Sequence, residues 1–596
     1  MTHYAVPLDD MRFALFDVAH AEKLYQRLPG CEEASRELVD AVLEEAARFT
    51  EQVLAPLNQT GDEEGCHFDP SAHAVTTPQG FKEAYAQFVA GGWSGLNAPE
   101  AYGGQDLPES VGALVKEMID SANVAWGTYP LLSTGATDAL LQHGEEWQRE
   151  AFLKPIVAGR WTGTMCLTEP HCGSDLGLLK THAEPTDKDH YLISGTKIFI
   201  TAGEHDFTEN IVHLVLGRLP GAPAGTRGIS MFLVPKFKVD REGHMGERNA
   251  VQCGAIEHKM GIKGSATCVM NFDAAEGYLI GPAHRGLHAM FTMMNAARLA
   301  VGIQGLSLIE RAYQNSLLYA RERLQMRALT GPKYPDQAAD PLMVHPDVRR
   351  MLLTQKAFAE GGRALVAITA TLADIVLRSA EKAERETAEQ KLSFLIPIVK
   401  GMLTEVSIEC TNHAMQIFGG HGYITDNGME QLARDARITT IYEGTTQIQA
   451  LDLLGRKIFQ LQGVGLKLFL DEIGAFCQHH AGTAAMAEFI APLSAKAQEW
   501  SVLTQTVGKA AASNPDELGA ASVDYLYYSG YIVLAYCWAR SVAAAESGSR
   551  SDSFKEAKRR TARFYFQRIL PRTTAHAGSI QAGAASLMAM PDPLFG

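Results

Sequence analysis

Apolar residues recur at helical spacing through the first part of the chain. In the segment TPQGFKEAYAQFVAGGW, the side chains of Phe81, Tyr85, Phe88 and Val89 share one helix face. Thr77 is suited to cap this helix, and the glycine pair that follows is suited to end it. The pattern predicts a mainly helical N-terminal region.

From about residue 161 the pattern changes to short, β-branched runs separated by turn residues. The clearest runs are 191–201, 210–218, 229–235 and 266–272, and the connector GAPAGTRG separates the second from the third. Runs this close together leave no room for crossover helices. We therefore predict a mainly antiparallel sheet, arranged as a barrel or a sandwich.

Helical spacing returns near residue 283 and continues toward the C-terminus. A Pro- and Gly-bearing loop at 328–343 interrupts it, and its length suggests a function or contact with a partner. The predicted fold class is α+β, with an N-terminal extension (1–35), an N-terminal helical domain (36–160), a middle β domain (161–282), a helical bundle (283–455) and an extra C-terminal helical domain (456–596).

Composition narrows the function classes. The 596 residues carry a formal net charge of −15, which argues against general nucleic-acid binding but leaves a local basic patch open. The nine scattered cysteines form no C-x-x-C pair, so we expect reduced thiols rather than disulfides or a zinc site. The N-terminus lacks an apolar signal segment. The apolar stretch YIVLAYCWA is too short to span a bilayer, so we predict that it forms a buried helix. We expect a cytoplasmic protein without a transmembrane segment.

Two segments of the predicted sheet could carry chemistry. TMCLTEPHCGSDLG (164–177) ends in a turn whose backbone N–H groups, with the hydroxyls of Thr168 and Ser174, could hold an anion or a heteroaromatic edge. In KIFITAGEHD, Phe199 and Thr201 share a strand face and could stack on a ring and donate to it. Taken singly, an ordinary strand exit and an ordinary core strand explain these patterns equally well.

Two further segments lie among the later helices. In QIFGGHGY (416–423), paired glycines after a helix mark a C-cap turn or a close approach to a ligand, and no Rossmann fingerprint is present. In IYEGTTQIQ, Glu443 precedes a helix start, where Thr446 and Gln449 have the spacing of a capping box. From these residues alone, Glu443 is either a solvated loop residue or a carboxylate held at a reaction centre.

Together these segments resemble the acyl-CoA dehydrogenase family. The order and spacing of TEPHCGSD, K-x-F-x-T, RERLQ, QIFGGHGY and IYEGTTQIQ correspond over roughly residues 36–455. The longer C-terminal region and IEHKMGI (256–262) are similar to a long subgroup that includes 3-methylmercaptopropionyl-CoA dehydrogenases and bacterial fatty acyl-CoA dehydrogenases. The chain departs from common relatives at His171, Cys172 and Phe199, where small residues and a tryptophan are usual.

The resemblance implies a tightly bound FAD and an acyl-CoA substrate. The positions that match cofactor contacts are Thr168, Ser174, Phe199, Thr201, Arg323, Gln325, Gln416, Gly419, Gly420, Thr445 and Gln447. Those that match substrate contacts are Ser174, Asn295, Arg298 and Gly444. No metal is implied. Because the Arg323 position serves a neighbour's cofactor in the family, a homo-oligomer, either dimer or tetramer, is expected.

The implied reaction is α,β-dehydrogenation of an acyl-CoA thioester to the trans-2-enoyl-CoA. Glu443 would remove the α-proton, flavin N5 would take the β-hydride, and an electron-transferring flavoprotein would reoxidise the cofactor. The substrate implied first is a fatty acyl-CoA, as in β-oxidation, and the alternative is 3-methylmercaptopropionyl-CoA.

Two rival functions stay open. An acyl-CoA oxidase would use the same base and pass electrons to oxygen. A flavoprotein with a nucleic-acid-binding role would use the basic, aromatic segment 550–572, which otherwise reads as a helix with buried aromatics and solvated charges.

Overall fold

The computed structural model describes residues 3–596. The chain divides into two compact units, a helical unit and a sheet unit. The helical unit comprises Met1–Ala47, Glu109–Ser121 and Val301–Gly596, and the sheet unit comprises Arg48–Pro108 and Ala122–Ala300. None of the helices within residues 3–596 is both long enough and apolar enough to cross a bilayer.

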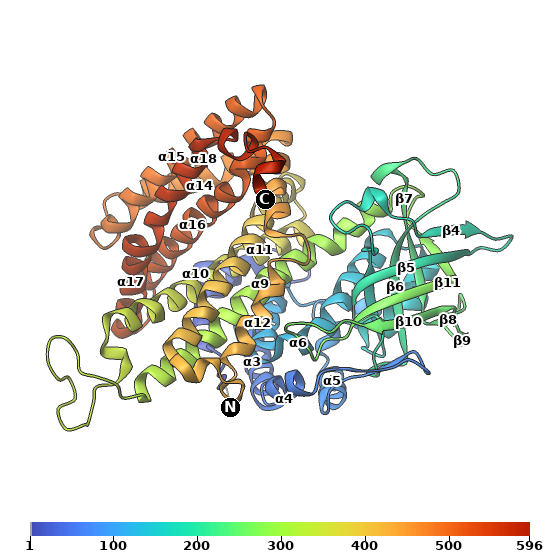
Figure 1. Ribbon diagram of the computed structural model, residues 1–596, viewed down its shortest axis with the longest axis horizontal. Helices are drawn as coiled ribbons and strands as arrows, with labels where there is room; N and C mark the ends of the chain where they lie inside the picture. Colours follow the sequence, from blue (N-terminus) through green and yellow to red (C-terminus); the bar gives the residue numbers. More distant parts are fainter. Residues whose placement is uncertain (1–2) are drawn as a thin grey trace. The chain divides into compact units, whose positions relative to one another are not determined.

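Long helices build most of the helical unit (Figure 1). Short helices begin it: α1 (Leu8–Arg12), α2 (Ala21–Tyr25) and α3 (Arg36–Phe49). The central helices are α9 (Gly286–Glu322, which belongs to this unit from Val301 onward), α10 (Pro346–Arg378), α11 (Lys382–Phe418), α12 (Met429–Thr439) and α13 (Thr446–Leu451). A π-helix (Asp452–Gln460) continues α13. The C-terminal helices are α14 (Val464–His480), α15 (Ala487–Ser513), α16 (Asp516–Ser547), α17 (Asp552–Phe564), α18 (Thr573–Ala582) and α19 (Ala585–Met588).

The apolar stretch that begins at Tyr531 lies in the middle of α16. Residues 531–539 are all buried, and Trp538 donates to the Ala357 carbonyl of α10 at 3.0 Å. A helix that is apolar on every side is expected in a core or a membrane, and here it forms a core. The prediction of a buried helix is confirmed.

The basic segment 550–572 is largely paired with acidic groups inside the helical unit. Arg550 and Arg572 each lie 2.7 Å from a carboxylate oxygen. Tyr565 and Phe566 are 0% and 8% exposed, so these rings do not present a stacking surface to nucleic-acid bases. The segment's contacts favour its structural interpretation over a nucleic-acid-binding one.

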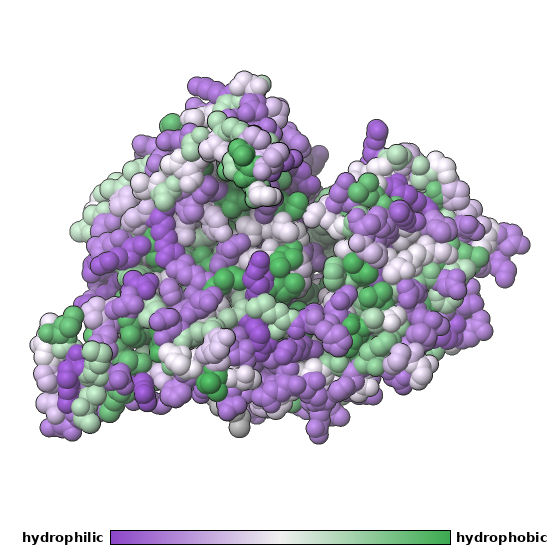
Figure 2. All heavy atoms as spheres, viewed as in Figure 1, coloured by the Kyte–Doolittle hydropathy of each residue, from purple (hydrophilic) through white to green (hydrophobic). Residues whose placement is uncertain are grey.

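A long loop, residues 323–345, joins α9 to α10 and projects from the helical unit (Figure 1). The buried Asp340 carboxylate organises it by accepting bonds of 2.8–3.0 Å from three backbone N–H groups of the loop. Met326 and Leu329 are 71% and 93% exposed, and hydrophobic atoms appear among hydrophilic ones at this tip (Figure 2). An ordered loop therefore presents apolar side chains outward.

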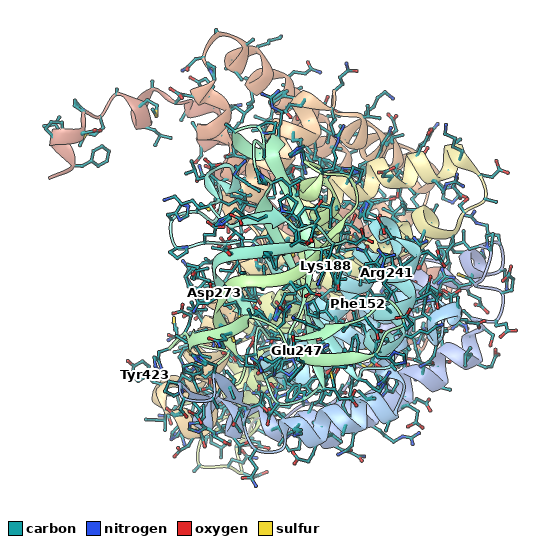
Figure 3. The ribbon with its side chains drawn as sticks, turned by 90° about the vertical axis from the view of Figure 1, so that its right-hand side faces the viewer. Phe152, Lys188, Arg241, Glu247, Asp273 and Tyr423 are labelled. Carbon is teal, nitrogen blue, oxygen red and sulfur yellow. The ribbon has the colours of Figure 1, made fainter. Side chains whose placement is uncertain are left out.

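The sheet unit contains eleven strands and several helices. The helices are α4 (Leu57–Glu64), α5 (Phe81–Ala90), most of α6 (Glu109–His143), α7 (Glu146–Gln148) and α8 (Lys154–Val157). The strands are β1 (His67–Asp69), β2 (Ala74–Thr76), β3 (Trp161–Cys166), β4 (His182–Pro185), β5 (Tyr191–Thr201), β6 (Asn210–Arg218), β7 (Ile229–Pro235), β8 (Phe237–Val239), β9 (Met245–Arg248), β10 (Val251–Ile256) and β11 (Thr267–Ile280). Figure 3 turns the strands toward the viewer and labels Asp273 on β11, Glu247 on β9 and Lys188 in the turn between β4 and β5.

The main sheet has seven strands in the order β10-β11-β5-β4-β6-β3, and β7 pairs with both β11 and β6. These pairings close a circuit through β11, β5, β4, β6 and β7, as in a barrel. Most pairs are antiparallel, whereas β3 runs parallel to β6 and β4 touches β6 in parallel at one position. The prediction of a mainly antiparallel sheet is confirmed.

Two local predictions concern helix ends and thiols. α5 ends at Ala90 before the glycine pair, as predicted, but Thr77 does not cap it. The Thr77 hydroxyl instead donates to Asp206 at 2.8 Å, and Gly80, with a φ of 86°, precedes the helix. All nine cysteines are free thiols in the structure, and eight of them are buried.

Candidate functional site

Phe199 lies in a β-bulge of β5. The pairing with β11 skips here, so Ile198 and Phe199 together oppose a single residue of β11. Phe199 has a φ of 60°, rare for an aromatic residue, and its side chain is 59% exposed. Thr201, at the end of the strand, is partly buried. The bulge therefore presents an aromatic ring at the surface of the sheet unit.

The turn that follows β3 is attached to this bulge. The Ile198 N–H donates to the Thr168 carbonyl at 2.9 Å, which places Thr168 beside the bulged strand. Ser174 is exposed and lies next to Asp175, whose carboxylate accepts from the Gly177 N–H. Thr168, Phe199 and Thr201 thus share one edge of the sheet unit, and Ser174 lies farther along the same turn.

A buried ion pair anchors the turn to β5. The fully buried Lys197 ammonium donates to Glu169 at 2.8 Å and to the Leu167 carbonyl at 2.9 Å. Glu169 also accepts from the backbone N–H groups of Lys180 and Thr181. Burial alone would raise the pKa of Glu169, but Lys197 and these hydrogen bonds lower it to about 2. The carboxylate therefore stays charged and holds both ends of the turn.

Three side chains of this turn resemble a metal-ligand set. One ligand atom each from Glu169, His171 and Cys172 lies within 4.8 Å of the others. However, Glu169 already accepts from Lys197 and two backbone N–H groups, and His171 Nε2 lies 3.0 Å from the Leu178 carbonyl and so carries its proton. That nitrogen is therefore not available to a cation in this arrangement, and the hydrogen bonds of Glu169 and His171 stabilise the turn.

Two of the four predicted substrate contacts lie on α9. Asn295 and Arg298 are three residues apart and are therefore neighbours on the helix surface. Asn295 is exposed, whereas the Arg298 residue is 4% exposed.

Three of the predicted cofactor contacts, Gln416, Gly419 and Gly420, lie at the end of α11. Gln416 is exposed on the last turn, and Gly419 has a φ of 61°, which favours glycine. A Cβ added at Gly419 or Gly420 would meet nothing within 4 Å, so the backbone here borders open space. The Tyr319 ring stacks on Phe418 at 4.0 Å and fixes the helix end. Such an exposed, side-chain-free turn can approach a ligand closely.

Arg323 and Gln325 follow α9 at the base of the long loop. Their backbones pair with the end of the loop that returns to α10. The Leu342 N–H donates to the Arg323 carbonyl at 2.8 Å, and the Gln325 N–H donates to the Asp340 carbonyl at 2.9 Å. Both residues are exposed. The structure therefore holds their backbones in place while their side chains face outward.

Glu443 lies in a tight turn with two successive left-handed residues. Its φ is 55° and that of Gly444 is 87°. A left-handed glutamate costs about 1–2 kcal/mol, so the surroundings must impose this conformation. A side chain at Gly444 would also meet Gln449 Nε2 at 2.7 Å, so glycine is required there. The turn partly buries Glu443.

Buried donors fix both carbonyls of this turn. Gln449 Nε2 donates to the Glu443 carbonyl at 2.9 Å, and Lys400 Nζ donates to the Gly444 carbonyl at 2.6 Å. Both donor residues are 0% exposed. On the N-terminal side, the hydroxyl of Tyr442 donates to Gln304. The backbone around Glu443 is thus held on both sides.

The helix that follows is capped differently from the prediction. Thr445, not Thr446, is the N-cap, and its hydroxyl accepts from the Ile448 N–H at 3.3 Å. Gln449 turns toward the Glu443 carbonyl and does not complete a capping box. The capping-box prediction was wrong because the Gln449 side chain donates to the Glu443 carbonyl and does not bond to the backbone of the N-cap residue. Gln447 is exposed on the first turn of α13.

Lys400 and Gln449 were not among the predicted site residues. Lys400 is the single charge in the run FLIPIVKGML, and a lone lysine in an apolar helix is the signal that could have identified it. Gln449 gave no comparable signal, since its capping-box spacing already explained it. The contribution of Lys197 and Glu169 could not be read from spacing, because it depends on how the turn folds onto β5.

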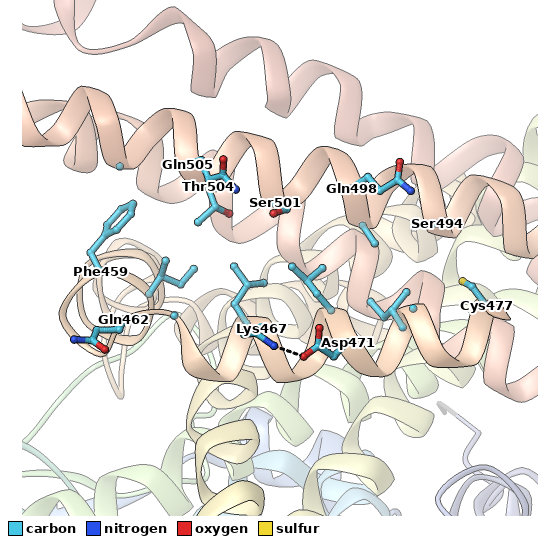
Figure 4. A pocket seen from close by; sticks show the side chains of 18 residues that line it. Phe459, Gln462, Lys467, Asp471, Cys477, Ser494, Gln498, Ser501, Thr504 and Gln505 are labelled. Atoms are coloured by element: carbon cyan, nitrogen blue, oxygen red, sulfur yellow. Dashed lines mark hydrogen bonds and ion pairs between the residues drawn. The ribbon is translucent and has the colours of Figure 1, made fainter. Parts of the chain in front are cut away.

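A hollow lies in the C-terminal helices, between α14 and α15 (Figure 4). It has a volume of about 660 Å³ and combines apolar side chains of α14 with amides and hydroxyls of α15. The charged residues among its described lining are Lys467 and Asp471, which pair with each other at 2.6 Å. None of the residues singled out for chemistry lines it, so we do not assign the reaction there.

Four protein-family models match most of the chain. The acyl-CoA dehydrogenase N-terminal, middle and C-terminal domains match residues 37–160, 164–275 and 284–458. A family described as acetyl-CoA dehydrogenase C-terminal like matches residues 469–591.

Curated relatives agree over the full length. A 3-methylmercaptopropionyl-CoA dehydrogenase of Ruegeria pomeroyi is 42% identical, covering 98% of this chain and 99% of its own. The broad-specificity linear acyl-CoA dehydrogenase FadE5 of Mycobacterium tuberculosis is 36% identical, covering 100% of both chains.

Solved structures show the same fold. Caenorhabditis elegans ACDH-11 in complex with C11-CoA superposes with a TM-score of 0.76 at 18% identity, covering 95% of this chain and 91% of its own. An acyl-CoA dehydrogenase complexed with FAD from Bacillus anthracis gives 0.75 at 20% identity, covering 93% and 89%. With matches of this length and identity, the chain belongs to the acyl-CoA dehydrogenase family.

Proposed function

We propose that the protein catalyses the FAD-dependent α,β-dehydrogenation of linear acyl-CoA thioesters, with Glu443 as the base. The observation that carries the proposal is the turn at Glu443, where a partly buried carboxylate sits on left-handed backbone fixed by two buried donors. Backbone strain of this kind concentrates at functional sites. In an oxidoreductase of this family, the chemistry that needs a fixed carboxylate is removal of the substrate's α-proton.

The residues present fit an FAD. The exposed Phe199 ring and the neighbouring Thr168 and Thr201 offer a stacking face and hydroxyl donors. The open backbone at Gly419 and Gly420 leaves room that a side chain would fill. When bound, FAD supplies the two-electron acceptor that the reaction requires.

Glu443 acts by taking a proton from the carbon next to the thioester. That proton is a weak acid, so the base must hold it more strongly than an exposed carboxylate would. An acyl chain that covers Glu443 excludes water, and desolvation disfavours the charged carboxylate relative to the protonated one. Fixing the backbone keeps the carboxylate at the distance that proton transfer needs.

The relatives suggest a short or medium linear acyl chain. One acts on 3-methylmercaptopropionyl-CoA, another is broad for linear acyl-CoA, and a third, 32% identical, is a butyryl-CoA dehydrogenase from Syntrophomonas wolfei. A methylthiopropionyl chain is nearly isosteric with a short straight chain, so one pocket could accept both. We propose fatty acyl-CoA as the substrate class, and the 42% identity of the first relative favours 3-methylmercaptopropionyl-CoA as the second candidate.

We further propose a homo-oligomer that uses an electron-transferring flavoprotein as acceptor. The long loop supports self-association, because Arg323 is exposed at its base and Met326 and Leu329 project from it. Exposed apolar side chains on an ordered loop are typical of protein contacts. Light scattering after size-exclusion chromatography tests the oligomer: a monomer with full FAD content would contradict it.

The reaction is tested by mixing purified protein with acyl-CoAs of increasing length, and with 3-methylmercaptopropionyl-CoA, in the absence of oxygen. Loss of the oxidised flavin absorbance with formation of the enoyl-CoA supports the proposal, and kcat/KM with an artificial acceptor ranks the substrates. Flavin that stays oxidised with every thioester would refute it. Rapid peroxide formation in air without another acceptor would instead identify an acyl-CoA oxidase.

A further inference from the structure

Lys400 lies in the interior of α11, where a charge is unexpected. Its neighbours Val399 and Met402 are 0% exposed, as is Lys400 itself. An ammonium is costly to bury unless it donates strong hydrogen bonds, and an apolar residue would satisfy the helix equally well. The position therefore requires an explanation outside α11.

The ammonium reaches out of its helix to the turn that carries Glu443. Lys400 Nζ donates to the Gly444 carbonyl at 2.6 Å, across 44 residues of sequence. A charged donor makes a stronger bond than a neutral one. It therefore fixes the Gly444–Thr445 peptide, on the far side of the two left-handed residues Glu443 and Gly444.

Gln449 holds the preceding peptide. Its side chain donates to the Glu443 carbonyl at 2.9 Å from the first turns of α13. The two consecutive carbonyls of the turn are thus held by donors from two different helices, α11 and α13. Rotation of either peptide would break a buried bond, so the pair resists relaxation of Glu443 to right-handed backbone.

We propose that Lys400 is a positioning residue for the proton-transfer step: it holds the Glu443–Gly444 turn in the conformation that presents the carboxylate to the substrate. The proposal rests on the proposed role of Glu443. Lys400 holds the backbone of the turn, so the role that we propose for it acts through Glu443. Its loss should slow the reaction while leaving cofactor and substrate binding nearly intact.

The test compares Lys400→Met with a control variant, Lys391→Met. Lys391 lies on the same helix as Lys400, and its ammonium pairs with Glu472 at 2.5 Å. Stopped-flow flavin reduction without oxygen gives the limiting rate and the acyl-CoA Kd for each FAD-loaded variant. We expect Lys400→Met to lower the limiting rate about 100-fold, as displaced catalytic groups do, with Kd changed less than threefold. Lys391→Met should match the wild type in both.

A second readout isolates proton transfer. Exchange of the substrate's α-proton in D2O, followed by NMR with excess acyl-CoA, should slow in Lys400→Met in step with flavin reduction. Lys400→Arg, which keeps a cationic donor, should recover part of both rates. If Lys400→Met fails to fold, Gln449→Leu removes the companion bond and should give the same kinetic pattern.

The outcomes separate the two proposals. A wild-type protein that never reduces its flavin with acyl-CoA overturns the proposed function. An active wild type, with Lys400→Met reducing flavin and exchanging protons at undiminished rates, overturns only the positioning role. A loss confined to FAD content or Kd, with the limiting rate unchanged, also overturns it, because that pattern reports a structural lysine.

Discussion

Two turns in different units of the protein use a buried lysine in similar ways. In the sheet unit, Lys197 donates to the Leu167 carbonyl and holds the turn beside Phe199. In the helical unit, Lys400 donates to the Gly444 carbonyl and holds the turn that carries Glu443. In both places a non-glycine residue adopts a left-handed conformation close to the anchor.

The difference lies in what each lysine pairs with. Lys197 also forms an ion pair with Glu169, whose carboxylate gathers further backbone donors, so its contribution is to the folding of the turn. Lys400 holds the carbonyl of Gly444, the residue that follows the proposed base. The comparison suggests that removing the first lysine costs stability and cofactor retention, whereas removing the second costs reaction rate.

The largest effect is expected from Glu443→Gln. The amide keeps the size of the side chain but cannot take a proton, so the rate of flavin reduction should fall about 10²–10⁴-fold. FAD content should stay at the wild-type level, because the substitution leaves the sheet unit unchanged. Anaerobic stopped-flow spectroscopy measures the rate. Undiminished reduction would show that another group removes the proton.

Lys197→Met should have the next largest effect, on stability. It leaves Glu169 buried without its cation, which costs about 3–5 kcal/mol for a buried pair. Calorimetry should show a lower Tm, and gel filtration should show FAD loss. Lys188→Met, at an exposed turn of the same unit, is the matched control and should be neutral within about 0.5 kcal/mol. If the two variants had the same Tm and FAD content, Lys197 would not be needed to hold the turn.

Acid should destabilise the turn held by Lys197 and Glu169 within a defined pH window. The pKa of Glu169 is lowered from 4.5 to about 2, so its contribution is complete above pH 4.5 and is lost as pH falls toward 2. The full loss is on the order of 3 kcal/mol. Tm measured across this window should fall in the wild type and fall less in Glu169→Gln. Parallel curves for both proteins would show that other groups dominate acid unfolding.

The sequence predicts the elements around both turns better than the turns themselves. Hydrophobic spacing located β5, β6 and β7 at their observed bounds, because strand periodicity is a local property. The bulge at Phe199 could not be predicted, since it depends on how β5 registers with β11. Likewise, Gln449 has capping-box spacing, but tertiary contacts direct it to the Glu443 carbonyl. Resemblance supplied the roles of the site residues, and only the fold shows what holds them.

The smallest effect is expected from substitutions of Thr445, which test whether this residue contacts FAD as well as capping α13. Thr445→Ala removes a hydroxyl that accepts from Ile448 at 3.3 Å and should cost about 1 kcal/mol. Ser551 caps α17 with the same 3.3 Å geometry, so Ser551→Ala should cost the same without loss of FAD.

If Thr445 also contacts FAD, Thr445→Ser should restore both stability and cofactor affinity. Thr445→Asn caps well but lacks the hydroxyl, so it should restore only stability. Calorimetry and flavin fluorescence titration separate the two effects. If Thr445→Ala binds FAD as tightly as the wild type, Thr445 serves only as the N-cap of α13. Any contact with FAD near Glu443 would then come from other residues of the turn.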